Sequence, residues 1–288
     1  MLYLILAALC SAALTLVLKY FQDPKVNRFG IILGNYMTCV LLAFLQMPEK
    51  RQLFSVSSST LLMSVIAGFL YVAGLVLIQT SVKRNGAMLT SAFSKLGLIV
   101  PLLISFLFFD EVPTLLKTGG LILAVAAILL INSAPKDARR KAAADGSGVS
   151  LPFLLLTLTA VGCSDSMTKI FSRLGNQEED TRYFFFLFLT AGLLTVVLAV
   201  RETRKTGKKI KPSALAAGIL AGIPNYFASY LLLHALLELP ATLVFPFYSV
   251  GSILLVTAGG ALFFREKLGR RQLFGFALIL GALVLLNL

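Results

Sequence analysis

Two oppositely charged side chains interrupt long apolar runs of this sequence, and their chemistry needs an explanation. Lys95 lies ~13 Å from the end of one run at 1.5 Å per residue, and Asp165 lies well inside another. An ammonium at the centre of a membrane-spanning helix costs roughly 3 kcal/mol unless it faces water or a partner. Ser94 and Ser164 stand directly beside the two charges. We expect Lys95 to hold a carboxylate or another anion, and Asp165 to hold an amine or a coupling proton.

Both charges also have structural alternatives. Lys95 is compatible with a structural ion pair or with a side chain that snorkels along a groove. Asp165 and Lys169 are four residues apart, with the acid first, and this spacing predicts a self-neutralising pair on one helical face. If Lys169 instead reaches the membrane interface, Asp165 is left in a cavity with Lys95, and a zwitterionic solute fits between them.

Polar side chains recur at helical spacing in two of the apolar runs. The run at 86–109 carries Thr90, Ser91, Ser94, Lys95 and Ser105, and the run at 240–264 carries Thr242, Tyr248, Ser249 and Ser252. Pro101 interrupts the first stripe and frees a backbone carbonyl there. We expect the two stripes to line a central cavity.

Smaller polar groups complete the predicted binding site. We assign to it Lys95, Asp165, Ser94, Tyr71, Asn35, Asn225, Tyr248 and Ser164. Buried amides and phenols of membrane helices also bond neighbouring helices, which is the alternative role for these residues. The sequence has no glycine-rich phosphate loop with a lysine, and its one His and three Cys cannot form an ordinary zinc site. We therefore predict no catalysis, no metal and no cofactor.

The apolar runs are predicted membrane spans. Of 288 residues, 58% are hydrophobic and 14% charged, and the mean hydropathy of +0.88 excludes a soluble globule. Ten runs of about 20 residues are each long enough to cross about 30 Å of hydrocarbon as a helix. They lie at 1–20, 29–47, 60–82, 86–109, 112–133, 151–173, 182–201, 212–236, 240–264 and 269–288. The predicted fold is an all-α integral membrane protein.

The second half of the chain repeats the first at reduced fidelity. Glu111 falls on Glu266 and Gly120 on Gly275, 155 residues later. Copies with an odd number of spans lie upside down relative to each other, as in many secondary transporters, with the substrate site at the midplane. We predict a first repeat at 1–133, a basic cytoplasmic linker at 134–150 and a second repeat at 151–288. A monomer is then sufficient for one pathway, and a homodimer is compatible with it.

Two segments carry a resemblance to a known family. LFFREKLGRRQLFGFALILGALVLLN at 262–287 and FFDEVPTLLKTGGLILAVAAILLIN at 108–132 resemble the end of an EamA domain of the drug/metabolite transporter (DMT) superfamily. The resemblance extends over nearly the whole chain and implies ten helices as two inverted five-helix repeats, with export as the common direction. Glu111 and Glu266 each end a span beside the next helix, where a carboxylate accepts backbone N–H groups. We assign both, with Gly120 and Gly275, to the structure of the fold.

The basic residues predict the orientation in the membrane. Nineteen Lys and Arg lie in or next to the connectors after odd-numbered spans, and five lie in or next to the other connectors. By the positive-inside rule the first set is cytoplasmic and both termini are outside, whereas the resemblance implies cytoplasmic termini. Because topology explains the net charge of +13, nucleic acid is not a predicted partner. The predicted partners are the lipid bilayer and a small solute.

These features predict a secondary active transporter of the inner or plasma membrane that works by alternating access. Its substrate is expected to be a small polar metabolite, such as an amino acid or organic anion, driven by a proton or solute gradient. A multidrug exporter of organic cations is the first alternative, but it predicts an acid without a competing cation. A lipid-linked flippase needs a lateral opening to the bilayer. A membrane scaffold or sensor would leave the two polar stripes without a role.

Overall fold

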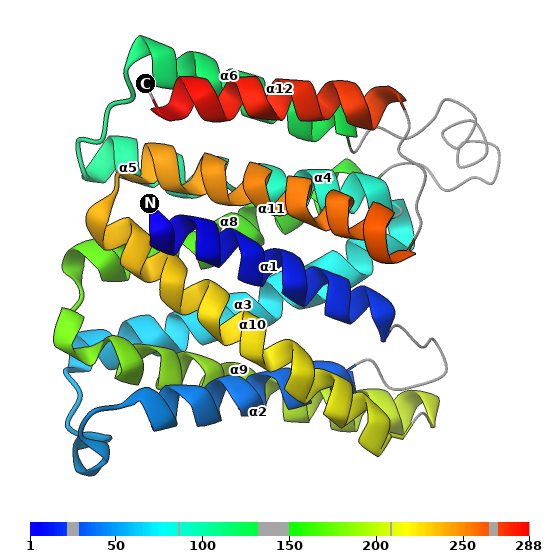
Figure 1. Ribbon diagram of the computed structural model, residues 1–288. Coiled ribbons are helices and arrows are strands. Elements are labelled where there is room, and N and C mark those ends of the chain that lie inside the picture. Colours follow the sequence, from blue (N-terminus) through cyan, green and yellow to red (C-terminus); the bar gives the residue numbers. More distant parts are fainter. Residues whose placement is uncertain (22–28, 86, 132–149, 208, 265–269, 288) are drawn as a thin grey trace. The chain divides into compact units, whose positions relative to one another are not determined.

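The computed structural model describes residues 1–21, 29–85, 87–131, 150–207, 209–264 and 270–287 of the chain, and every regular element within them is a helix (Figure 1). The elements are α1 (Leu2–Tyr20), α2 (Phe29–Gln46), η1 (Lys50–Gln52), α3 (Ser58–Asn85), α4 (Ala87–Leu96), α5 (Ile99–Phe108), α6 (Leu115–Ile131), α8 (Leu151–Leu174), η2 (Gln177–Glu179), α9 (Asp180–Thr206), α10 (Pro212–Glu238), α11 (Ala241–Phe264) and α12 (Arg270–Asn287).

The helices coincide with the predicted spans. Eight stretches of the described helices are long and apolar enough to cross a membrane, with α4 and α5 together forming one of them at Thr90–Phe108. Two further apolar helical stretches, Leu115–Leu130 and Ala277–Leu286, are shorter and fall in the predicted fifth and tenth spans. The predicted all-α membrane fold is confirmed.

The helices form two compact units, and each unit contains helices from both sequence halves. Unit 1 comprises Met1–Val72 and Ile170–Glu238, and unit 2 comprises Ala73–Lys169 and Leu239–Leu288. The boundaries fall inside α3 and α8, so each of these helices contributes to both units.

Unit 1 is built on the close contact between α2 and α10. In Figure 1, α10 lies beside α1 and crosses α2, and α9 lies along α2. A Cβ atom on Gly34 of α2 would lie 2.5 Å from the carbonyl oxygen of Leu215, and one on Gly218 of α10 would collide with the carbonyl oxygen of Ile31. The two backbones can approach this closely only because both positions lack a side chain, as in other membrane helix pairs.

In unit 2, α12 packs along α6, and α11 contacts α5, α6 and α12 (Figure 1). Gly120 lies in the contact between α6 and α12, where an added Cβ would be 2.9 Å from Leu286 Cγ and 3.1 Å from the carbonyl oxygen of Ala282. Gly275 is buried within α12. The fourth residue assigned to the fold, Glu266, lies outside the described residues.

The predicted continuous span at 86–109 is wrong in one respect, because the structure divides it into α4 and α5 at Gly97 and Leu98. Pro101 has no N–H to donate to the carbonyl oxygen of Gly97. That oxygen instead accepts the N–H of Val100 at 3.0 Å, one residue earlier than in an α-helix. The N–H groups of Gly97 and Leu98 likewise bond three residues back, to Ser94 and Lys95. The proline therefore ends α4 one turn before its own position.

The break between α4 and α5 lies directly against α8. A Cβ on Gly97 would be 3.1 Å from the backbone nitrogen of Gly162, and one on Gly162 would be 2.5 Å from the carbonyl oxygen of Gly97. Lys95 precedes this contact by two residues, and Asp165 follows it by three. The crossing of two glycines therefore sets where Lys95 and Asp165 of unit 2 can lie.

Candidate functional site

Lys95 lies in the last turn of α4, where the chain is about to break. Its side chain is half-buried inside a stretch that is apolar enough to span a membrane. A cation in the last turn of a helix is stabilised by the partial negative charge of the terminal carbonyl groups. The short helix α4 therefore ends with its only ammonium at a favourable electrostatic position.

The ammonium of Lys95 is held by α11. Lys95 Nζ donates a hydrogen bond to Ser252 Oγ at 3.2 Å, and Ser252 Oγ in turn donates to the carbonyl oxygen of Ser249 at 2.9 Å. Ser252 is 1% exposed, so it fixes one side of the ammonium within the protein. These contacts join the two polar stripes seen in the sequence at 86–109 and 240–264.

Asp165 on α8 supplies the opposite charge in the same unit. Its half-buried carboxylate interacts electrostatically with Lys95. Among the described residues, however, no cationic nitrogen forms an ion pair with Asp165 within 4.0 Å. The two charges of unit 2 therefore attract each other without forming an ion pair.

The other predicted site residues of unit 2 are hydroxyl groups. Ser94 lies beside Lys95, and its Oγ donates a hydrogen bond to the carbonyl oxygen of Thr90 at 2.9 Å. The lone pairs of Ser94 Oγ can still accept a hydrogen bond from another donor. Ser164 is buried beside Asp165, and Tyr248 is half-buried on α11, one helical turn before Ser252. Ser252 was not among the residues predicted to bind substrate, although its helical spacing from Tyr248 could have identified it.

The amides of unit 1 bond each other. Asn225 Nδ2 of α10 donates to Asn35 Oδ1 of α2 at 2.7 Å, and Cys39 Sγ lies 3.4 Å from the carbonyl oxygen of Gly222. Tyr71 Oη and Ser229 Oγ are 3.4 Å apart. Asn35 and Asn225 thus have the helix-joining role that is common for buried amides in membranes. Of the eight residues predicted to bind substrate, Asn35, Tyr71 and Asn225 belong to unit 1, and the other five belong to unit 2.

Lys169 forms its ion pair with Glu111 rather than with Asp165. Lys169 Nζ is 2.6 Å from Glu111 Oε1, and the two side chains are 0% and 7% exposed. Glu111 Oε2 also accepts the N–H of Ala241, the first residue of α11, at 2.7 Å. The expected contact of Glu111 with a helix N-terminus is therefore made to α11, not to α6. The pairing expected from the four-residue spacing is not the one in the structure.

Metal chemistry has no support in this region. Within the part of the chain that the structure describes, no group of three or more His, Cys, Asp or Glu side chains could hold a metal ion. The arrangement of Lys95, Ser252 and Asp165 offers charge and hydrogen bonds to a solute, without a nucleophile and base in contact. It can bind and orient a charged molecule.

Comparison with known proteins decides the class. A model of the EamA-like transporter family matches residues 1–133 and 151–288, which is most of the chain. The chain belongs to the EamA-like transporter family. This EamA protein is therefore a multi-pass membrane transporter of the DMT type, and the proteins of its family are transporters rather than enzymes.

Two individual proteins match the EamA protein over nearly its whole length. An uncharacterized protein of Haemophilus influenzae is 26% identical over 287 residues, which cover 97% of this chain and 95% of the relative. A solved crystal structure matches with a TM-score of 0.72 at 14% identity, covering 99% of this chain and 94% of that one. At this identity the structural match supports the fold of the EamA protein alone.

Proposed function

We propose that this EamA protein is a secondary active transporter that exports a small anionic or zwitterionic metabolite, such as an amino acid or organic anion, by alternating access. The observation that carries the proposal is the ammonium of Lys95, held by Ser252 in an apolar span and facing the charge of Asp165 without an ion pair. A half-buried lysine in a span costs roughly 2.5–3.5 kcal/mol on insertion scales. Binding of a carboxylate or another anion would explain why a lysine with this cost is present in the span.

Asp165 extends the proposal to zwitterions and to coupling. A solute with a carboxylate on Lys95 and an amine on Asp165 satisfies both charges, whereas a simple anion leaves Asp165 free to carry a proton. Because the sequence has no phosphate-binding loop for ATP, we infer that a proton or solute gradient drives transport. The break between α4 and α5 beside Lys95 fits the discontinuous helices that form substrate sites in several transporter folds.

The experiment is counterflow uptake by the purified protein in proteoliposomes, with a panel of amino acids, carboxylates, phosphorylated metabolites and organic cations. We expect uptake of an anion or a zwitterion above the level of protein-free liposomes. Asp165→Asn is expected to reduce uptake of zwitterions by at least about tenfold, because a charge-assisted hydrogen bond contributes roughly 1.5–3 kcal/mol, and to reduce simple anions less. Uptake of organic cations alone would replace this proposal with the multidrug alternative.

We further propose that the basic connectors are cytoplasmic and that both termini lie outside the cell membrane. The support is the bias of nineteen basic residues against five. A C-terminal fusion to alkaline phosphatase, which is active only outside, is expected to be active, and the same fusion to green fluorescent protein is expected to stay dark. The reverse pattern would place the termini in the cytoplasm and would mean that this protein does not follow the positive-inside rule.

A further inference from the structure

A groove in unit 2 is lined by residues other than Lys95 and has a different chemical character. It has a volume of about 350 Å³, which is within the range of ligand pockets, about 300–1,000 Å³. Its walls come from α5, the connector after α5, α6 and the first turn of α11. The lining residues are Ile99, Leu102, Leu103, Phe106, Val112, Pro113, Lys117, Thr118, Leu121 and Thr242.

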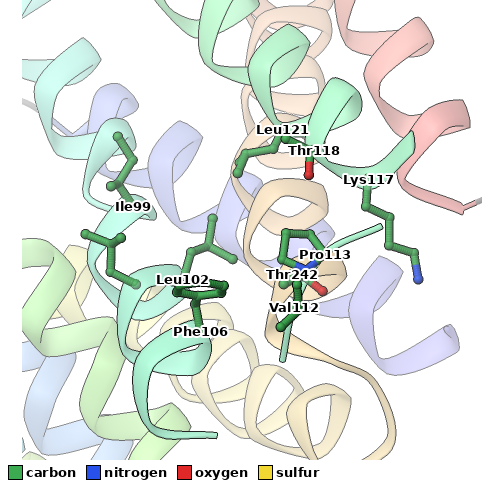
Figure 2. Close-up of a pocket in the computed structure, with 10 residues that line it drawn as sticks. Ile99, Leu102, Phe106, Val112, Pro113, Lys117, Thr118, Leu121 and Thr242 are labelled. Atoms are coloured by element: carbon green, nitrogen blue, oxygen red, sulfur yellow. The ribbon is translucent and has the colours of Figure 1, made fainter. Parts of the chain in front are cut away.

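The groove is open along lips that a bilayer would cover. Leu103, Phe106 and Val112 are 52%, 48% and 68% exposed, and the first two belong to a stretch that is long and apolar enough to span a membrane. Figure 2 shows Ile99, Leu102 and Phe106 on one side of the groove, facing Pro113, Thr118 and Leu121 on the other. Water finds few hydrogen-bond partners in such an apolar space, whereas an apolar chain makes the dispersion contacts that an empty groove lacks.

One end of the groove is cationic. Lys117 lies beyond Pro113 at the margin of the lining residues, and its side chain extends away from α5 (Figure 2). The side chain is half-buried, and among the described residues no carboxylate forms an ion pair with it within 4.0 Å. Thr118 Oγ1 beside it donates its hydrogen to the carbonyl oxygen of Thr114 at 3.0 Å, so an anion at this end would bind to the ammonium rather than to this hydroxyl. An apolar groove that ends at an unpaired ammonium complements an amphipathic anion.

The predicted topology makes the position of Lys117 unusual. It is one of only five basic residues in or next to the connectors that we place outside, where the positive-inside rule gives no reason for a lysine. A lysine acts as a compact point charge toward phosphate groups, and the head group of an anionic phospholipid carries such a phosphate.

We propose that this groove binds one acyl chain of an anionic phospholipid, whose phosphate group lies against Lys117. The lipid comes from the surrounding bilayer and is a ligand distinct from the transported solute. The acyl chain fills the space between α5 and α6, and the head group stays at the interface beside the first turn of α6. The lipid would thereby join α5, α6 and α11 within unit 2.

The test measures lipid retention by the full-length protein. We would delipidate the protein in detergent, add phosphatidylglycerol or phosphatidylcholine at equal concentrations, and count bound lipids by native mass spectrometry. Wild type is expected to bind one phosphatidylglycerol about fivefold more tightly than one phosphatidylcholine, the factor that corresponds to about 1 kcal/mol for a basic residue at an anionic surface. Lys117→Gln is expected to remove this preference, and Lys117→Arg is expected to retain it.

Two further variants separate the groove from general charge attraction. Lys50→Gln removes a lysine from another connector of the same predicted side and is expected to leave the preference intact. Val112→Trp places a large side chain on the exposed lip and is expected to reduce binding of both lipids, because it occupies the groove. Equal binding of the two lipids to wild type would overturn the proposal without any variant. An unchanged preference in Lys117→Gln, or an equal loss in Lys50→Gln, would do the same.

Discussion

Replacing Lys95 by Ala is expected to reduce counterflow of the anionic or zwitterionic substrate at least about 30-fold, while the protein stays folded in the membrane. In the proposed complex the ammonium of Lys95 pairs with the negative group of the substrate. Removing one partner of such a buried, hydrogen-bonded charge pair costs at least about 2 kcal/mol of binding free energy, which corresponds to a factor of about 30 in affinity. The ammonium contacts Ser252 and has no described ion-pair partner, so its loss leaves no uncompensated charge in direct contact. The effect should therefore be on transport and not on stability.

Conservative variants distinguish charge from geometry at this position. Lys95→Arg keeps the positive charge and is expected to retain part of the activity. Ser252→Ala removes only the hydroxyl that orients the ammonium, so we expect a smaller loss of about two- to tenfold, and Ser252→Thr is expected to restore activity because it keeps the hydroxyl. Lys50→Ala, at an exposed position in the connector after α2, is the control for loss of a positive charge.

Two results would contradict a substrate role for Lys95. If Lys95→Ala and Asp165→Asn both transport at wild-type rates, the two charges are structural. If Lys95→Ala lowers the melting temperature and transport in proportion, the lysine acts through the fold. Melting curves of the purified variants, recorded in the same detergent as wild type, separate the second case from a true loss of binding.

Helical periodicity explains how much of this site was visible in the sequence. The period of 3.6 residues puts Ser94 and Lys95 on a polar stripe of one span and Tyr248 and Ser252 on a stripe of another, and the structure joins these stripes by the bond from Lys95 to Ser252. The site is predictable to this extent because each stripe is a property of a single helix.

Contacts between distant helices are not contained in such patterns. Nothing in the spacing of Glu111 and Lys169, 58 residues apart, indicates that they pair, whereas the four-residue spacing of Asp165 and Lys169 suggests a pair that the tertiary structure does not form. The break of α4 was partly predictable, because Pro101 signals lost helical bonding. Its position at Gly97 also depends on the contact with Gly162 of α8, which only the folded structure supplies.

Breaking the ion pair between Glu111 and Lys169 is expected to have the largest effect on stability. Removing one partner of a buried pair costs about 3–5 kcal/mol because the other charge remains buried. Lys169→Ala strands the carboxylate of Glu111, and Glu111→Ala strands the ammonium and also removes the acceptor of the Ala241 N–H at the start of α11. We expect both single variants to unfold at markedly lower temperature than wild type in detergent, and Lys50→Ala to match wild type.

A double variant tests whether the cost arises from the stranded charge. In Glu111→Gln with Lys169→Met, the glutamine keeps an oxygen for the Ala241 N–H and the methionine fills the space of the lysine stem, so no buried charge remains. Since well-packed neutral replacements of buried pairs are often neutral or stabilising, the double variant should be more stable than either Glu111→Ala or Lys169→Ala. The matched singles Glu111→Gln and Lys169→Met complete the cycle, which should give a coupling free energy of at least about 1 kcal/mol.

The same cycle determines whether this pair belongs to the transport cycle. If the double variant regains stability and transports normally, Glu111 and Lys169 hold α8 and α11 together without further function. If it regains stability but does not transport, the pair must change partners during alternating access, and its charges are part of the mechanism. Single variants as stable as wild type would mean that both charges reach water, in contradiction to their burial in the structure.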